Sequence, residues 1–170
     1  MNQAAKSVFR VMIDAPIERV WNELTRTDKP RPFFWNSRCD TPGLEPGAPI
    51  RMRSANGKYT AVTGTVVEIE PPYRYSHTFK FTGFDDPECR VTYELREVDG
   101  QTEFTLINEN VPAGTKTEKY MTQGGAFITE NLKAILETGK PTFGGRFILL
   151  MIKLTEWMTP AKSKSENWPL

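Results

Sequence analysis

Residues 116–138 read KTEKYMTQGGAFITENLKAILET, the clearest helical pattern in the chain. The apolar and small residues recur every three or four positions, which places them in one stripe along a helix. They are Met121, Gly124, Gly125, Ile128, Leu132, Ile135 and Leu136. At a rise of about 1.5 Å per residue, the segment forms a rod of about 33 Å. Such a rod is long enough to cross a whole small domain.

Gly124 and Gly125 stand in the middle of this predicted helix, where each glycine costs about 1 kcal/mol relative to alanine. One explanation is close packing of the helix backbone against a bulky neighbour, or a kink. The other is that the missing side chains leave room for a ligand. The sequence leaves both explanations open.

The segments before this helix alternate between apolar and polar residues, as β-strands do. A first strand is predicted over residues 7–13, and a short helix over residues 17–24 follows it. Five further strand-like runs cover residues 49–54, 59–70, 73–81, 88–98 and 102–110. The breaks between these runs are short, which implies an antiparallel meander. Strands followed by one long covering helix predict an α+β fold, in a domain of residues 1–140.

Between the short helix and the meander, residues 25–35 read TRTDKPRPFFW. Prolines next to Phe33, Phe34 and Trp35 favour short helical turns folded over the sheet. The segment is predicted to form a lid or plug over the interior. The alternative is that these aromatic residues simply close one end of the core.

One face of each predicted strand turns toward the long helix. This inner wall is apolar and aromatic with a few uncharged polar groups, which is typical of small-molecule pockets. In the run 59–70, the residues expected to face inward are Ala61, Thr63, Thr65, Val67 and Ile69. The predicted cavity residues are Trp35, Met52, Thr65, Tyr75, His77, Phe79, Tyr93, Asn108, Met121, Gly124, Gly125 and Ile128. Tyr75, His77, Tyr93 and Asn108 are expected to orient the polar groups of a ligand.

Composition excludes several classes of partner. The formal net charge is +1 and the pI is about 7.7, so no strong field favours nucleic acid. The first residues lack the long apolar run of a signal peptide, and no run of 18 apolar residues occurs, which predicts a cytoplasmic protein. Cys39 and Cys89 are too few and too far apart for a metal site or a disulfide framework. No cofactor is expected.

The sequence contains no recognisable catalytic machinery. His77 is the only histidine, so neither a two-histidine metal site nor a histidine network can be assembled. No glycine-rich phosphate loop, nucleophile elbow or paired-cysteine motif occurs. A lone histidine among aromatic residues is either a satisfied core residue or a pocket group that orients a ligand or acts as a base. No catalytic residue and no metal ligand is therefore assigned.

Four blocks in this order give a specific resemblance: APIERVWxxL at residues 15–24, GTVVEIEPPxR at 64–74, VTYEL at 91–95 and ENLKAILETG at 130–139. The chain resembles the START-like (SRPBCC) superfamily, and within it the bacterial branch named after the C-terminal domain of the activator of Hsp90 ATPase. The resemblance implies the helix-grip fold, a curved sheet of six or seven antiparallel strands around a long C-terminal helix with a cavity between them. Relatives include lipid carriers, polyketide cyclases and a chaperone-binding domain, so the fold fixes no single activity.

Residues 141–170 extend beyond the family domain and contain RFILLMIKLTEWM at 146–158. More than half of the circumference of this predicted helix is apolar, so something is expected to cover it. The first expectation is docking on the chain's own sheet or cavity mouth. The others are a homodimer or another protein partner through the stretch from Phe147 to Met158, and, as the least favoured, a membrane surface.

Three functions are consistent with these features. The first is non-catalytic binding of a hydrophobic small molecule, lipid-like or polyketide-like, between the sheet and the long helix. The second is a protein-interaction module similar to the Hsp90 ATPase activator domain. The third is an enzyme similar to the polyketide cyclases, in which positioned polar groups guide ring closure.

Overall fold

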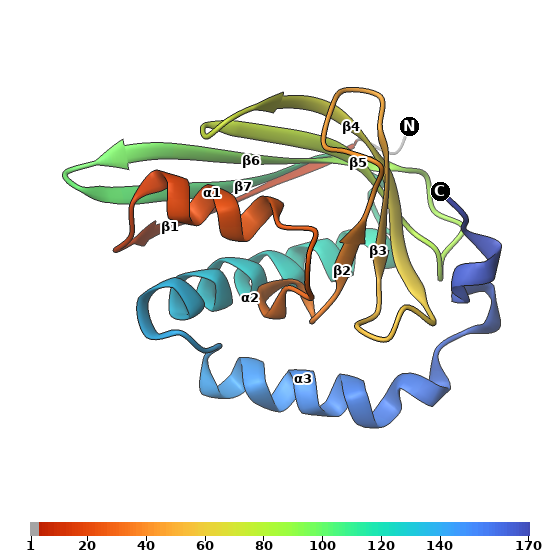
Figure 1. The fold of residues 1–170 in the computed structure, drawn as a ribbon. Coiled ribbons are helices and arrows are strands. Elements are labelled where there is room, and N and C mark those ends of the chain that lie inside the picture. The colour runs from red at the N-terminus through yellow and green to blue at the C-terminus, as the bar shows by residue number, and fades with distance from the viewer. Residues whose placement is uncertain (1–3) are drawn as a thin grey trace.

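The computed structural model describes residues 4–170 (Figure 1). The strands are β1 (Ala5–Ile13), β2 (Arg38–Asp40), β3 (Pro49–Arg53), β4 (Thr60–Glu70), β5 (Arg74–Phe81), β6 (Cys89–Val98) and β7 (Gln101–Val111). The α-helices are α1 (Ile17–Thr25), α2 (Lys116–Thr138) and α3 (Phe143–Thr155). Short 3₁₀ turns cover Pro32–Phe34, Glu156–Met158, Ala161–Ser163 and Ser165–Asn167.

The strands form one antiparallel sheet in the order β1-β7-β6-β5-β4-β3-β2. The sheet curves, and α1 and α2 both lie on its concave side (Figure 1). This arrangement confirms the predicted α+β helix-grip fold. The seventh strand, β2, was not predicted as a run of its own because three residues are too few to show a period of two.

Helix α2 begins and ends at local signals in the sequence. The Thr115 hydroxyl accepts a hydrogen bond from the Glu118 backbone N–H at 3.2 Å, and the Glu118 carboxylate accepts one from the Gly114 N–H at 2.7 Å. At the other end Gly139 adopts the left-handed conformation, with φ 79°, and its N–H bonds the Ile135 carbonyl. The predicted bounds of the helix are therefore confirmed.

In β4 the predicted inward face is wrong for most of the strand. Val62 and Val66 are buried, whereas Thr65 is exposed. Gly64 lies so close to the backbone of Thr78 that no side chain fits there, which fixes which residues of β4 face the core. A bulge at Val67 then shifts the pattern by one residue, so Ile69 does pack on the core as predicted.

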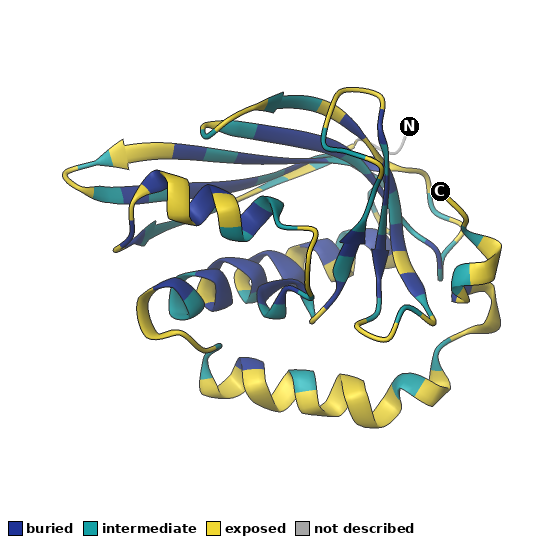
Figure 2. Ribbon diagram, viewed as in Figure 1, coloured by how far each residue is buried: buried dark blue, intermediate teal, exposed yellow. Residues whose placement is uncertain are grey.

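Helix α3 is the outermost element of the structure (Figure 1). Its residues after Gly145 are exposed, apart from the half-buried Leu149, whereas the face of α2 toward the sheet is buried (Figure 2). The expectation that this segment docks on the chain's own sheet or cavity mouth is therefore wrong. Within residues 4–170, no helix is both long and apolar enough to cross a bilayer.

Both ends of α3 are fixed to the domain. At the N-terminal end, the Asn131 side-chain oxygen accepts hydrogen bonds from the N–H and the hydroxyl of Thr142, both at 3.1 Å. After α3 the chain returns to the sheet, where the Thr82 hydroxyl donates to the Ser163 hydroxyl at 2.9 Å. Arg53 also donates to the Trp168 carbonyl at 3.1 Å. These contacts hold α3 at two points and leave its apolar surface free.

Candidate ligand-binding site

The glycine pair of α2 is explained by two aromatic rings that pack against the helix backbone. A side-chain carbon at Gly124 would lie 2.8 Å from Cη2 of Trp35, and one at Gly125 would overlap the ring of Phe9. The prediction of close backbone packing is confirmed. The alternative, that the glycines leave room for a ligand, is wrong in this conformation because the two rings occupy that room.

A small cavity lies next to these rings, between α2 and the inner face of β5, β6 and β7. Its lining residues are Phe34, Trp35, Phe79, Phe81, Val91, Tyr93, Leu106, Asn108, Tyr120, Met121, Gly124, Gly125 and Ile128. Its volume is about 20 Å³. A cavity needs roughly 10–15 Å³ by this measure to hold one water molecule. The closed interior thus has space for about one water and none for a lipid.

Eight of the twelve predicted cavity residues line this space: Trp35, Phe79, Tyr93, Asn108, Met121, Gly124, Gly125 and Ile128. Met52, Tyr75 and His77 are buried but lie outside the lining. Thr65 is not a cavity residue, because the actual pairing of β4 points its side chain outward. Five lining residues were missing from the predicted set: Phe34, Phe81, Val91, Leu106 and Tyr120. Phe34 follows Phe33 in an aromatic run, and no periodicity shows which ring of such a run faces a cavity.

Trp35 closes the cavity as a plug. Its ring stacks on Phe127 of α2, with centroids 5.0 Å apart and planes 9° apart, and meets Phe34 edge-on at 5.2 Å. Trp35 adopts a left-handed backbone conformation, with φ 49°, directly after the 3₁₀ turn Pro32–Phe34. Phe33 and Phe34 belong to the buried core and Trp35 packs against it, so the structure fits both a lid and a closed end of the core, and opening of this plug stays a prediction.

Three polar rings form the sheet side of the interior. Tyr75, His77 and Tyr93 lie together, with centroids 5.2–5.8 Å apart. His77 Nδ1 is 2.7 Å from the Thr78 carbonyl, so Nδ1 carries the proton and Nε2 is an acceptor. Neither His77 Nε2 nor the Tyr75 hydroxyl has a hydrogen-bond partner in the part of the chain described. Only one of the two ring nitrogens of His77 therefore has a hydrogen-bond partner.

Burial keeps these groups uncharged. Desolvation lowers the pKa of His77 to about 4, raises that of Tyr75, and raises that of Tyr93 to about 12. All three side chains are neutral at pH 7. In contrast, the Asn108 amide already donates to the Ser7 hydroxyl at 3.1 Å, so only its remaining capacity is free for a ligand.

Arg31 is a buried cation close to this polar cluster, and no periodic pattern in the sequence predicts its burial. It is 3% exposed and donates to the Leu24 carbonyl at 3.0 Å and to the Met52 sulfur at 2.8 Å. Its guanidinium carbon lies 5.3 Å from the centroid of the Phe34 ring. Within residues 4–170, Arg31 forms no ion pair with a carboxylate, and its Nε has no partner.

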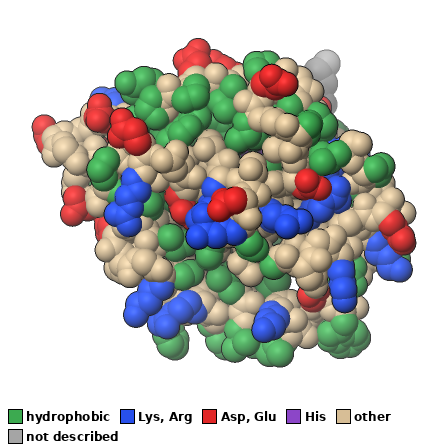
Figure 3. All heavy atoms as spheres, viewed as in Figure 1, with side chains coloured by type: hydrophobic (Ala, Val, Ile, Leu, Met, Phe, Trp, Pro, Cys, Tyr) green, Lys and Arg blue, Asp and Glu red, His purple; other side chains and the backbone are tan. Residues whose placement is uncertain are grey.

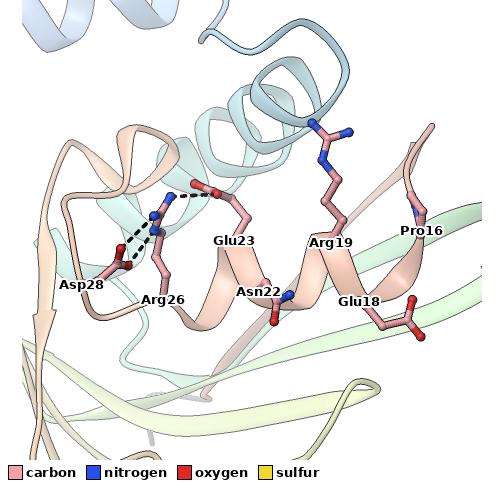
Figure 4. A pocket seen from close by; sticks show the side chains of 7 residues that line it. All are labelled: Pro16, Glu18, Arg19, Asn22, Glu23, Arg26 and Asp28. Carbon is pink, nitrogen blue, oxygen red and sulfur yellow. Dashed lines mark hydrogen bonds and ion pairs between the residues drawn. The ribbon is translucent and has the colours of Figure 1, made fainter.

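A second hollow lies along the outer side of α1 (Figure 4). Arg26 pairs with Glu23 and with Asp28 at 3.1 Å, whereas Glu18 and Arg19 are exposed and form no ion pair within residues 4–170. Within residues 4–170, this hollow therefore has no buried charged or polar side chain, and its charges stay in contact with solvent. In the described part of the chain, no three His, Cys, Asp or Glu side chains gather so that they could hold a metal ion.

Comparison with known proteins places this architecture in a family. Residues 14–137 match the model of the activator of Hsp90 ATPase homolog 1-like proteins. The chain belongs to this family. No curated protein matches it.

Three solved structures illustrate the range of this fold. The Aha1 dimer from Colwellia psychrerythraea is 21% identical, with a TM-score of 0.63, over 80% of this chain and 98% of its own. DynU16, a protein in the dynemicin biosynthetic locus, is 27% identical, with a TM-score of 0.62, over 80% of this chain and 48% of its own. An HSP90 activator from Plasmodium falciparum is 19% identical, with a TM-score of 0.62, over 80% and 97%.

Proposed function

We propose that the chain binds a hydrophobic small molecule between α2 and the inner face of the sheet. The observation that carries the proposal is the pair of unpartnered polar atoms, the Tyr75 hydroxyl and His77 Nε2, beside an apolar cavity lined by Tyr93. Leaving a buried polar group without a partner costs about 1–3 kcal/mol. A ligand that pairs with both atoms recovers that free energy and gains further affinity from burial of its apolar area.

The two atoms specify complementary groups on the ligand. Neutral His77 presents an acceptor at Nε2, which suits a hydroxyl donor. The Tyr75 hydroxyl can donate, which suits a carbonyl or another oxygen acceptor. Burial lowers the pKa of His77 to about 4 and raises that of Tyr75, so at pH 7 they are a weak base and a weak acid, which favours binding and orientation over proton transfer.

Entry of a ligand requires the plug to move, because the closed cavity holds only about 20 Å³. Trp35 is the ring to displace. It covers the cavity at Gly124 and is itself only partly buried. Outward rotation of this one ring would open the space between Phe34, Phe127 and α2.

Uptake of the uncharged fluorophore N-phenyl-1-naphthylamine tests the proposal. We expect the native chain to bind the dye with a blue shift, and Trp35→Ala to bind it faster and more tightly because the plug is removed. Tyr73→Ala, an exposed ring next to β5, is the matched control and should behave as the native chain does. Absence of uptake by both the native chain and the folded Trp35→Ala variant would rule out the proposed cavity.

A further inference from the structure

Arg31 carries a buried charge that the protein itself does not neutralise. An isolated charge in the interior is costly unless it is paired, and buried charges in proteins are normally paired or ligated. The Leu24 carbonyl and the Met52 sulfur accept hydrogen bonds, and the Phe33 and Phe34 rings lie 5.8 and 5.3 Å from the guanidinium carbon. These neutral partners leave the full positive charge in place. At least three of the five N–H donors of the guanidinium remain unused.

The position of this charge connects it to the proposed cavity. Phe34 lines the cavity and also contacts the guanidinium, so one ring separates Arg31 from the ligand space. The charge of Arg31 also acts on the pKa values of Tyr75, His77 and Tyr93, because the guanidinium lies near all three rings. Arg31 and the plug Trp35 belong to one turn, so displacement of that turn would expose the guanidinium to an entering ligand.

We propose that the ligand is an acidic amphiphile, with an anionic oxygen that pairs with Arg31 and an apolar body that fills the cavity beneath Trp35. This assignment rests on the proposed function and names its ligand class. A guanidinium fork matches the two oxygens of a carboxylate, and such charge-assisted bonds are about twice as strong as neutral ones. The Tyr75 hydroxyl is a second donor for the same oxygens.

A matched pair of probes tests the charge directly. Binding of 2-naphthoate and of 2-naphthalenemethanol would be measured by calorimetry at pH 7.5. We expect the native chain to bind the acid at least about tenfold more tightly than the alcohol, a difference of about 1.4 kcal/mol. Arg31→Met should lose that preference while keeping its affinity for the alcohol. Arg10→Met, on the exposed side of β1, is the control and should keep the preference.

The outcomes separate the two proposals. Equal affinity of the native chain for acid and alcohol would overturn the role of Arg31 while leaving the cavity intact. A preference that persists in Arg31→Met would also overturn it. If the native chain binds neither probe, the proposed function is overturned, and the assignment of the ligand class is overturned with it. If Arg31→Met does not fold, the preference of the native chain for the acid over the alcohol tests the proposal. Arg31→Lys, which keeps the charge, should then retain part of that preference.

A second, independent observation concerns α3, which presents an apolar surface to solvent. Phe147 is 58% exposed and Leu154 57%, and Trp157, in the 3₁₀ turn that follows α3, is 78% exposed. Figure 3 shows hydrophobic and basic side chains together along the lower edge of the molecule, where α3 lies in Figure 1. The helix is held at both ends and does not pack on the domain, so its apolar surface is accessible to a partner.

The charge pattern around α3 indicates its partner. Arg146 and Lys153 are seven residues apart, which places them on the same side of the helix, at the border of the apolar arc. Residues 140–164 also include Lys140, Lys162 and Lys164, with Glu156 as the sole acidic residue in that stretch. Lys162 lies 3.7 Å from the fully exposed Asp85. Apolar side chains flanked by basic ones suit an anionic lipid surface.

This geometry points to α3 as a helix that lies in the surface layer of an anionic membrane. With 13 residues it is about 20 Å long, whereas the apolar core of a bilayer is about 30 Å thick, so the helix lies on the surface and does not span it.

Vesicle flotation tests the assignment. The full chain should float with vesicles of phosphatidylglycerol and phosphatidylcholine at low salt, and not with phosphatidylcholine alone. Phe147→Ser with Leu154→Ser should abolish flotation, and Arg146→Gln with Lys153→Gln should weaken it several-fold. Tyr73→Ser, an equally exposed ring outside α3, is the control. No flotation, or a dimer of twice 19.4 kDa by light scattering that the double serine variant dissociates, would overturn the assignment.

Discussion

The ring of His77 is fully buried, and this burial lowers its pKa to about 4. The unfolded chain, with a pKa near 6.5, binds more protons than the folded chain between these values. The stability linked to His77 is therefore complete above about pH 6.5 and is lost as the pH falls toward 4.

We expect the free energy of unfolding to fall by roughly 3 kcal/mol from this group over that range, which urea titrations at pH 4 and pH 7 would measure. His77→Gln should show a correspondingly smaller loss, and carboxylates titrating in both proteins cancel in the comparison. Because the chain has one histidine, its imidazole NMR signal gives the pKa directly. A value near 6.5 in the folded chain would contradict the buried, neutral ring.

At Gly125, the addition of a single methyl group is expected to change the stability of the fold. A methyl group there would overlap the ring of Phe9. Replacement by alanine gains about 1 kcal/mol of helix propensity, but overpacking costs about 1–3 kcal/mol. We expect Gly125→Ala to be less stable by about 1 kcal/mol in urea denaturation, whereas Gln123→Ala, exposed on the same helix, should change stability by less than about 0.5 kcal/mol. An increase in stability with Gly125→Ala would mean that Phe9 does not pack there.

At the scale of the element, α2 depends on its N-terminal cap. The Thr115 hydroxyl satisfies the Glu118 N–H, and Asp86 accepts from the Thr117 N–H at 3.1 Å, so two of the first free donors of the helix are paired. Thr115→Ala should cost about 1 kcal/mol in urea denaturation. Thr122→Ala, exposed within the same helix, is the control and should not destabilise the fold. Equal effects of the two variants would contradict the cap.

At the scale of the whole molecule, the core draws only on residues up to Leu136, and α3 with the tail contributes polar contacts to the sheet edge. We expect a chain of residues 1–140 to keep a cooperative urea transition with a lower midpoint, because Arg53 and Thr82 lose partners but no core residue is removed. Circular dichroism would follow the transition. Loss of cooperativity would show that residues 141–170 belong to the same folding unit.

The sequence by itself determined the elements whose pattern is local and periodic. The stripe of α2, with Met121, Ile128 and Leu132, and the alternation of β5, β6 and β7 predicted the helix, the strands and seven lining residues of the cavity. In these segments the helix or strand is regular, so the spacing of the apolar residues shows which side chains face the core. The helix-grip fold followed from those elements and from the family resemblance.

Some features are set by contacts between segments that are distant in the sequence, and only the tertiary structure decided these. Trp35 and Phe9 fill the space at the glycine pair, the close packing at Gly64 and the bulge at Val67 together set which residues of β4 face inward, and α3 stands away from the domain. The burial of Arg31 without a counter-charge belongs to the same group. Each of these features depends on contacts between residues that are distant in the sequence. Local periodicity along the chain does not predict such contacts.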